Sequence, residues 1–346
     1  MTLVSTASPA HDASRTSGAS VQVASGNAIR IIDAALRGIR AGERAVLAAV
    51  LETEGSTYAG TGAMAVFGEG GHVGWLSGGC LEPEIEQCAI AAASSGTIGW
   101  LEIDTRADES LLSGSAVGCR GRLRMALLPL HELAGIESVL ERWLLGHAHV
   151  MLEVTAGGVV RIEASTLHRE WSLHAQPVAW PAQRWSVSIP RPPDVLILGA
   201  GPESATLVPL LRELGWRVRV AERRPRWRDD AALARLRNAA MLLDATPRDA
   251  LVQAGDVDAV LVMHHHFELD REALDALAAS TIPFIGLLGP VRRQEDLFKL
   301  LRPEQRAALQ PRLRSPVGID LGGRGPETIA LSIAAQMQAW RHDAGA

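Results

Sequence analysis

Lysine is almost absent from this sequence of 346 residues, because Lys299 is the only one. A phosphate-binding loop of the Walker type requires a Gly-Lys-Ser/Thr sequence, so this class of nucleotide site is excluded. The scarcity of lysine also argues against Schiff-base catalysis, which uses a lysine amine. Long apolar runs are absent too, and we therefore expect no helix that spans a membrane.

Cysteine and net charge are low as well. Cys80, Cys88 and Cys119 are too few for the disulfide framework of a secreted domain, so we expect a reducing, cytoplasmic setting. The formal net charge of −5 differs from the basic excess of most nucleic-acid-binding domains, and no nucleic-acid partner is expected. The length and the hydrophobic content of 47% fit a globular protein of two domains.

Composition divides the chain into three parts. Residues 1–26 are rich in Ser, Ala and Thr but lack the basic and apolar regions of a signal peptide, and they predict a disordered tail. Residues 27–190 contain short strands, hairpin turns and helices, and the run Pro190-Arg-Pro-Pro193 marks a domain boundary. Residues 191–346 alternate strands with helices. The predicted fold class is therefore α/β, with a domain of mixed strands and helices followed by a Rossmann-like, doubly wound parallel sheet.

The most informative stretch of the first domain is Ser77-Gly-Gly-Cys-Leu-Glu82. Two apolar strands precede it and apolar residues at helical spacing follow it, so a helix is expected to begin near Cys80. Paired glycines let successive backbone N–H groups point at one anion, and a helix N-terminus favours the thiolate form of cysteine, which binds metals or attacks. The alternative is that Cys80 is a small packing residue in a tight turn.

Three other stretches of the first domain have weaker sequence signals. Thr53–Gly62 is a glycine-rich loop that either brings backbone amides close to a ligand or serves as a flexible connector. Residues 131–145 predict a helix with one apolar side. Residues 165–185 contain Trp, His and Pro without a clear period, so no regular element is predicted there.

The stretch Ser77–Glu82, preceded by Gly55-Ser56 and Gly62-Ala-Met64, resembles the N-terminal domain of the xanthine dehydrogenase accessory protein family (XdhC/CoxI). Tyr58 departs from the family pattern, which carries Arg or Pro before the next glycine, so a side-chain contact from that position does not transfer.

A second motif of the family is recognised between Ala116 and Leu130. Cys119 is kept there, whereas Arg120 replaces a glycine and Leu128 replaces an acid. The arginine either crowds a close backbone approach or supplies positive charge to an anionic ligand, and the sequence leaves both alternatives open.

The second domain opens with a strand, Asp194–Leu198, and the turn Gly199-Ala-Gly-Pro-Glu-Ser204. Gly199 permits a tight turn, Gly201 lets a pyrophosphate approach the next helix, and Glu222 follows at the distance of the acid that takes a ribose hydroxyl. Arg223 and Arg224 beside it leave NADP or another phosphate-bearing ligand open. This pattern is evidence for a dinucleotide-binding fold rather than for one particular cofactor.

A later strand, Asp258–Met263, ends in three consecutive histidines. Adjacent side chains on an extended chain point to opposite faces, so the run does not make a three-ligand metal site, although one histidine at this sheet edge is expected to contact a ligand. In the family, Met263, His265 and Asp270 have counterparts, and His264 stands where a threonine is usual.

Two more family motifs follow, Pro283–Gly289 and Ser315–Ile333, so the motifs occur in the family's order along most of the chain. The resemblance implies a maturation factor that binds the molybdenum cofactor, as molybdopterin or its cytosine dinucleotide. It also implies that the factor supports sulfuration of the cofactor and hands it to an apo molybdenum hydroxylase of the xanthine, CO or aldehyde dehydrogenase type, with a cysteine desulfurase as a further partner. The candidate cofactor-binding residues, with Cys80 as the candidate molybdenum contact, are Ser77, Gly78, Gly79, Cys80, Glu82, Cys119, Gly199, Gly201, Glu222 and His265.

The alternative function is an NAD(P)-dependent oxidoreductase that uses the Rossmann-like domain, supported by Gly199, Gly201 and Glu222. No catalytic acid–base set is recognised beyond the histidine run, so we expect a cofactor-binding factor rather than a turnover enzyme. A homodimer is expected because the long apolar final helix exceeds what one sheet covers.

Overall fold

The computed structural model describes residues 2–5, 27–106, 120–146, 148–228 and 241–345, and these form two compact units, Met1–Pro192 and Pro193–Ala346. Most of the predicted tail, including residues 6–26, lies outside the described residues. Thr2–Ser5 differ from the expected irregular chain, because they form a short strand, β1, that pairs with a neighbouring strand through backbone hydrogen bonds.

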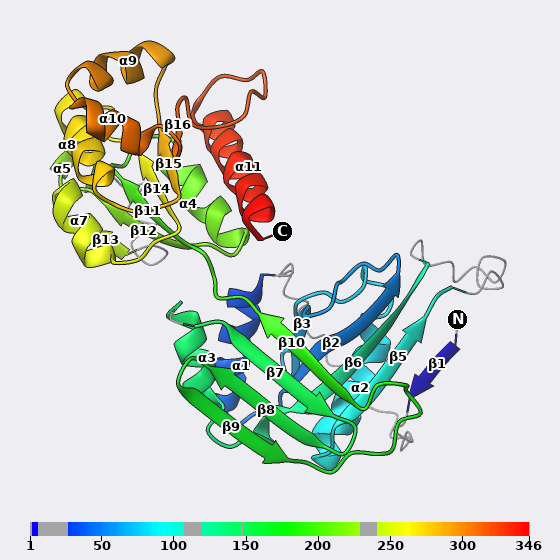
Figure 1. The fold of residues 1–346 in the computed structure, drawn as a ribbon. Helices are drawn as coiled ribbons and strands as arrows, with labels where there is room; N and C mark the ends of the chain where they lie inside the picture. The colour runs from blue at the N-terminus through cyan, green and yellow to red at the C-terminus, as the bar shows by residue number, and fades with distance from the viewer. Residues whose placement is uncertain (1, 6–26, 107–119, 147, 229–240, 346) are drawn as a thin grey trace. The chain divides into compact units, whose positions relative to one another are not determined.

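The first unit is built on a six-stranded sheet in the order β1-β5-β6-β2-β3-β4, with antiparallel pairing between neighbours (Figure 1). Its other strands are β2 (Val46–Gly55), β3 (Met64–Gly68), β4 (Gly71–Val73), β5 (Gly99–Asp104) and β6 (Gly121–Pro129). Helix α2 (Glu82–Ser95) packs its buried side on one face of this sheet, and α1 (Ala28–Ala41) packs on the other.

A four-stranded antiparallel sheet in the order β10-β7-β8-β9 shares the core on the α1 side. Its strands are β7 (Val150–Thr155), β8 (Val159–Ala164), β9 (Leu167–Ser172) and β10 (Arg184–Ile189). Trp100 of β5 fills this core, with its ring centroid 5.4 Å from Trp185 and 5.6 Å from Trp180. These aromatic contacts join the two sheets through one apolar interior.

Two expectations for the first unit were wrong. The helix expected over 131–145 is divided into a 3₁₀ turn (Leu130–Glu132) and α3 (Glu137–Leu144), because Gly135 adopts φ +78° between them. Residues 165–185, for which no regular element was expected, supply β9 and the start of β10. Both strands alternate exposed residues with more buried ones, a period that the flanking Trp, His and Pro residues obscure in the sequence.

The second unit is a parallel sheet in the order β13-β12-β11-β14-β15-β16, with helices on both faces (Figure 1). The strands are β11 (Asp194–Leu198), β12 (Arg217–Ala221), β13 (Met241–Leu243), β14 (Ala259–Val262), β15 (Phe284–Leu287) and β16 (Leu313–Arg314). The helices are α4 (Ser204–Glu213), α5 (Pro225–Arg228), α7 (Pro247–Ala254), α8 (Phe267–Ala278), α9 (Val291–Lys299), α10 (Pro303–Leu309) and α11 (Pro326–Gly345).

Side chains on alternate positions of β11 enter two different cores. Val195 and Ile197 pack with α4 and α11, whereas Leu196 and Leu198 pack with α7, α8, α9 and α10. The chain reverses its strand order at β11, where the first connection runs to β12 and a later one to β14. This is the doubly wound arrangement, and the predicted fold class is confirmed. In the described part of the chain, no helix combines the length and the apolar character needed to cross a membrane.

Candidate functional site

The turn that carries Cys80 is closed by the side chain of Glu82. Oε1 of Glu82 accepts hydrogen bonds from the backbone N–H groups of Leu76, at 3.1 Å, and Ser77, at 2.8 Å, and Oε2 accepts one from the Ser77 hydroxyl. The backbone N–H of Leu81 donates to that hydroxyl at 3.1 Å. Helix α2 therefore begins at Glu82, two residues later than the sequence suggested, and the carboxylate ties its first turn to the end of the preceding segment.

The Glu82 side chain is buried, with 3% of the residue exposed. Burial by itself raises the pKa of this carboxyl, but the hydrogen bonds from Ser77 and from the backbone amides outweigh burial, so the pKa lies below its ordinary value. Glu82 is thus an ionised, fully bonded acceptor at neutral pH. Ser77 and Glu82 were both predicted to bind a cofactor directly. In the structure they form hydrogen bonds with each other and with backbone amides of the turn, and these bonds stabilise its conformation.

The next three residues present an open surface. Gly78, Gly79 and Cys80 are exposed, and no described residue accepts a hydrogen bond from their backbone N–H groups. Gly79 adopts φ +97°, a conformation that favours glycine, and the Cys80 thiol lies 3.9 Å from the Ser77 hydroxyl oxygen. Unpaired amides beside a thiol at the start of α2 form a surface that can accept an oxyanion or a metal-bound oxygen.

Aromatic side chains flank this open stretch on two sides. A Cβ atom built on Gly78 would lie 4.0 Å from Cδ2 of Tyr58, and one built on Gly79 would lie 3.7 Å from Cζ3 of Trp75. Tyr58 is 60% exposed, although its neighbour Ala59 is buried and anchors the loop. The first three residues of the predicted loop Thr53–Gly62 belong to β2, and the residues that follow the strand reach the cysteine turn. A planar ligand bound to the open amides would meet an aromatic ring there.

The second family motif lies against the same loop. The backbone N–H of Ser56 donates to the carbonyl of Arg120 at 3.0 Å, and a Cβ atom on Gly55 would lie 2.6 Å from that oxygen. A Cβ atom on Gly121 would lie 2.5 Å from the carbonyl of Ser56. Gly55 and Gly121 are therefore required for close backbone contact, and the structure brings these two motifs together. Cys119 lies outside the described residues.

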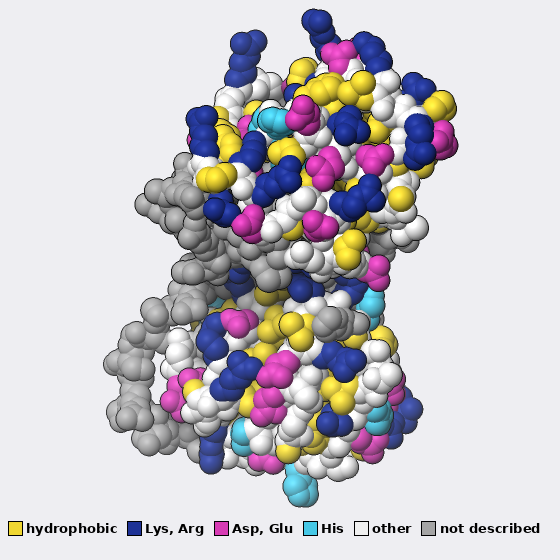
Figure 2. Space-filling view, turned by 90° about the vertical axis from the view of Figure 1, so that its left-hand side faces the viewer, with side chains coloured by type: hydrophobic (Ala, Val, Ile, Leu, Met, Phe, Trp, Pro, Cys, Tyr) yellow, Lys and Arg dark blue, Asp and Glu magenta, His cyan; other side chains and the backbone are white. Residues whose placement is uncertain are grey.

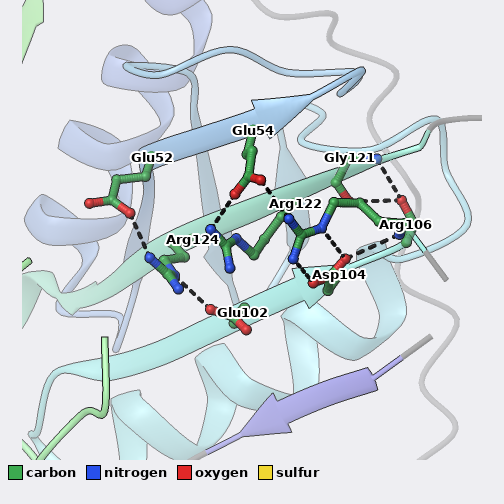
Figure 3. Close-up of polar contacts among 9 residues, drawn as sticks. Glu52, Glu54, Glu102, Asp104, Arg106, Gly121, Arg122 and Arg124 are labelled. Atoms are coloured by element: carbon green, nitrogen blue, oxygen red, sulfur yellow. Dashed lines mark hydrogen bonds and ion pairs between the residues drawn. The ribbon is translucent and has the colours of Figure 1, made fainter. Parts of the chain in front are cut away.

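An ion-pair ladder crosses the ends of β2, β5 and β6 beside this contact (Figure 3). Arg124 bridges Glu52, at 2.9 Å, and Glu102, at 2.6 Å, and Arg122 pairs with Glu54. Figure 3 shows these side chains pointing toward one another from three strands. Glu52, Glu54, Arg122 and Arg124 also line part of a hollow of about 320 Å³. Because the arginines are paired with carboxylates, the ladder fixes the strand ends rather than offering free positive charge.

Arg106, the last described residue after β5, also takes part in this ion-pair ladder. It donates to Glu54 at 2.6 Å and to Asp104 at 2.6 Å, and the hydrogen bond from Arg106 lowers the pKa of Asp104 to about 2. Arg106 and Glu54 are exposed and Asp104 is half-buried, so solvent screens these ion pairs. Their role is to hold the β5 end in register with β2 and β6.

The turn after β11 has the glycine geometry that its sequence predicts. Gly199 adopts φ +93°, and a Cβ atom there would lie 2.5 Å from Cα of His264, so the ends of β11 and β14 approach each other closely. The backbone N–H of Gly201 donates to the Ser204 hydroxyl at 3.1 Å. The predicted residues Gly199, Gly201, Glu222 and His265 are therefore gathered at one edge of the parallel sheet.

Glu222 is buried, with 1% of the residue exposed, and its oxygens are already engaged. Oε2 accepts from the Ala200 backbone N–H at 2.7 Å, and both oxygens accept from the guanidinium of Arg224. Burial alone raises the pKa of Glu222, but the hydrogen bonds from Arg224 and Ala200 outweigh burial and lower it. A ribose hydroxyl would have to displace one of these donors. Arg224 also donates to the carbonyl of His264 at 2.6 Å, so it closes the turn against β14.

The three histidines after β14 have separate environments. His264 is buried, and its Nδ1 lies 3.0 Å from Oδ1 of Asp270, a carboxylate that also accepts from Arg293 at 2.6 Å. His265 is exposed, with φ +53°, and its Nε2 lies 3.4 Å from Oε2 of Glu203. His266 is exposed at the start of α8. No group of three His, Cys, Asp or Glu side chains able to hold a metal is found among the described residues.

Glu203 is a residue of this edge that the sequence interpretation missed. It precedes α4, and its side chain is 8% exposed beside Gly201 and His265. An acidic residue immediately before a helix in a glycine turn was the available signal, because carboxylates are stabilised at helix N-termini. The sequence motif of a dinucleotide-binding turn is defined by its glycines and does not specify the residue at position 203.

Figure 2 shows one face of the molecule, on which described basic and acidic side chains are interspersed over both units. This mixed distribution differs from the extended basic face that is typical of nucleic-acid-binding domains.

Comparison with known proteins gives matches to both units. The family model described as the XdhC Rossmann domain matches residues 195–337, and the model of the XdhC and CoxI family matches residues 39–104. A Bacillus subtilis (strain 168) protein, named as a probable subunit of xanthine dehydrogenase, is 27% identical over 314 residues, covering 85% of this chain and 92% of the relative. "Uncharacterized protein YqeB" of Escherichia coli (strain K12) is 30% identical over 149 residues, covering 42% of this chain and 27% of that protein.

A solved structure extends the match over nearly the whole chain. The crystal structure of a Bacillus halodurans protein, described as a xanthine dehydrogenase, has a TM-score of 0.75 and 26% identity, and the match covers 91% of this chain and 96% of that one. The two matched family domains occur here in the order that the sequence motifs predicted. The resemblance inferred from the sequence is confirmed, and the chain belongs to the XdhC and CoxI family.

Proposed function

We propose that this protein is a maturation factor for a molybdenum hydroxylase of the xanthine dehydrogenase type. It binds the molybdenum cofactor, supports its sulfuration and passes it to the apo-enzyme. Membership of the XdhC and CoxI family supports the link to xanthine dehydrogenase, as do the names of the Bacillus relatives.

The proposed site rests on one observation. The open stretch Gly78–Cys80 combines an exposed thiol with backbone amides from which no described residue accepts a hydrogen bond. The cofactor would present a terminal phosphate, oxygen and sulfur atoms on molybdenum, and a planar pterin. Backbone amides suit the phosphate or an oxo group, and thiolate sulfur is a ligand for soft metal centres. These residues fit the group, and Tyr58 beside Gly78 would contact a planar ring.

The chain's own residues would hold and release the cofactor rather than transform it. Glu82 keeps the turn in one shape by accepting from Leu76 and Ser77, and the exposed stretch Gly78–Cys80 follows directly from it. The bound cofactor would supply the redox chemistry of the client enzyme after transfer. The exposed position of Cys80 would leave the molybdenum centre accessible to an apo molybdenum hydroxylase and to a cysteine desulfurase as sulfur donor.

The competing function, an NAD(P)-dependent oxidoreductase, is not favoured by the described contacts of the Gly199–Ser204 turn. Glu222, the residue expected to take a ribose hydroxyl, is engaged with Ala200 and Arg224.

The ligand that copurifies under anaerobic conditions distinguishes the two functions. The proposal predicts molybdenum together with a pterin that becomes fluorescent on oxidation. A bound nicotinamide whose near-ultraviolet absorbance rises on reduction, without molybdenum, would overturn it. Transfer is tested by mixing the loaded protein with apo xanthine dehydrogenase, whose activity should rise with the amount of added complex.

A further inference from the structure

The turn between β11 and α4 has the sequence of a dinucleotide-binding turn, yet its anion position is already filled. In such turns the second glycine leaves room for a pyrophosphate above the helix N-terminus. A Cβ atom built on Gly201 would lie 2.9 Å from Oε2 of Glu203 and 3.4 Å from Nε2 of His265. The space above the glycine therefore contains a carboxylate and an imidazole.

The backbone amides of the turn are also used internally. Ala200 donates to Glu222 at 2.7 Å, Gly201 donates to the Ser204 hydroxyl at 3.1 Å, and Ser204 donates to the carbonyl of Gly201 at 3.0 Å. Pro202, the next residue of the turn, has no N–H to offer. The N–H groups of Ala200, Gly201 and Ser204 are therefore not free to bind the pyrophosphate that such turns accept.

Glu203 is held in this place by its surroundings. Its side chain is 8% exposed, and Oε2 lies 3.4 Å from Nε2 of His265. The hydrogen bond with His265 lowers the pKa of Glu203 below its ordinary value, so the carboxylate is ionised at neutral pH. His265 adopts φ +53°, and the close approach of Gly199 to His264 fixes the preceding residue against the turn. A left-handed conformation at a non-glycine residue indicates that the surrounding structure determines it.

We propose that Glu203 is a built-in anion that occupies the pyrophosphate position of this Rossmann-type turn, and that His265 holds it there. The second unit consequently does not bind NAD, NADP or another pyrophosphate-bearing nucleotide through this turn. Two like charges at contact distance repel strongly where solvent is partly excluded, and the carboxylate also fills the volume that a phosphate needs. This inference concerns the second unit only and does not depend on the proposed function.

The test uses the full-length protein and isothermal titration calorimetry with ADP and with NAD. Wild type should bind neither nucleotide at concentrations up to about 1 mM. Glu203→Ala removes both the charge and the bulk and should bind ADP at least about tenfold more tightly than wild type. Glu203→Gln keeps the bulk without the charge and should show a smaller gain. Glu268→Gln is the matched control, because it removes an exposed carboxylate from the same sheet edge, at the start of α8.

Three outcomes would overturn the proposal. Wild type could bind ADP or NAD with a Kd below about 1 mM, in which case the carboxylate does not exclude the ligand. Folded Glu203 variants, with a melting temperature close to wild type, could bind no more tightly than wild type. Glu268→Gln could gain affinity to the same extent as Glu203→Gln, which would assign the effect to net charge rather than to the position of Glu203.

Discussion

The Glu82 carboxylate and the backbone N–H of Ser77 form a 2.8 Å hydrogen bond within the turn that carries Cys80. The same carboxylate accepts from Leu76 and from the Ser77 hydroxyl, so three donors converge on one buried side chain. The following three residues are exposed, and no described residue accepts a hydrogen bond from their amides. The shape of the proposed cofactor site thus depends on a residue that would not touch the cofactor.

We expect Glu82→Ala to destabilise the protein by about 2–4 kcal/mol, because it leaves buried donors without an acceptor. The sign of the pH dependence follows from the lowered pKa of Glu82. A carboxyl whose folded-state pKa is below its unfolded value of about 4.5 stabilises the fold fully above that pH, and this contribution is lost as the pH falls through the folded-state pKa. Urea unfolding between pH 3 and pH 7 measures both effects.

The control for this change is Glu86→Ala, on the same helix. If Glu82→Ala and Glu86→Ala have the same small effect on the free energy of unfolding, the buried carboxylate does not organise the turn.

Gly79 and Gly78 should respond differently to substitution by alanine. Gly79 has φ +97°, so Gly79→Ala forces a side chain into a left-handed conformation and should cost about 1–2 kcal/mol. Gly78 lacks a positive φ, and a Cβ there makes only an ordinary contact with Tyr58, so Gly78→Ala should change stability by less than about 0.5 kcal/mol. Equal losses in chemical denaturation would show that the turn conformation does not require glycine at position 79.

Tyr58 should matter for binding and not for stability. The residue is 60% exposed, so Tyr58→Ala should leave the melting temperature within about 1 °C of wild type. Stacking between a planar heterocycle and an aromatic ring contributes about 1–3 kcal/mol, so pterin content after anaerobic purification should fall about tenfold. Tyr58→Phe retains the ring and should retain the pterin. Undiminished pterin in Tyr58→Ala would exclude a stacking role.

Glu222 is predicted to stabilise the second unit rather than to bind a ligand. Glu222→Ala removes the acceptor of the Ala200 amide and the partner of Arg224, and should destabilise the second unit by about 3 kcal/mol. Thermal unfolding measures this loss, and Glu222→Gln should retain part of the stability because an amide oxygen still accepts from Ala200. Wild-type stability in Glu222→Ala, together with weaker binding of a nucleotide, would restore the sequence-based expectation of a ribose contact.

The second unit was predictable because its signals are local. Each buried strand of four or five residues is followed by a turn and a helix, and the glycines at 199 and 201 mark where the turn must be tight. The cysteine turn was also identified from adjacent residues, including the proline near the start of α2.

The contacts that decide how each turn is used were not predictable. Glu82 and Glu203 both stand near helix starts, where an acidic residue is ordinary, and the sequence does not show which donors they face. The pairing of β10 with β7 joins residues about 35 apart, and the contact of Ser56 with Arg120 joins residues even further apart. Such pairings depend on the whole fold rather than on a local period.

The open turn at Cys80 is the proposed binding site of the molybdenum cofactor. The direct measurement is the molybdenum content, by mass spectrometry, of anaerobically purified wild type, Cys80→Ala and Cys88→Ala, each with its melting temperature. Cys88 lies within α2 and is only partly exposed, so Cys88→Ala controls for the loss of a thiol and should cost about 1 kcal/mol of stability while keeping the metal. We predict that folded Cys80→Ala loses most of its molybdenum; full molybdenum loading of that variant would contradict the account.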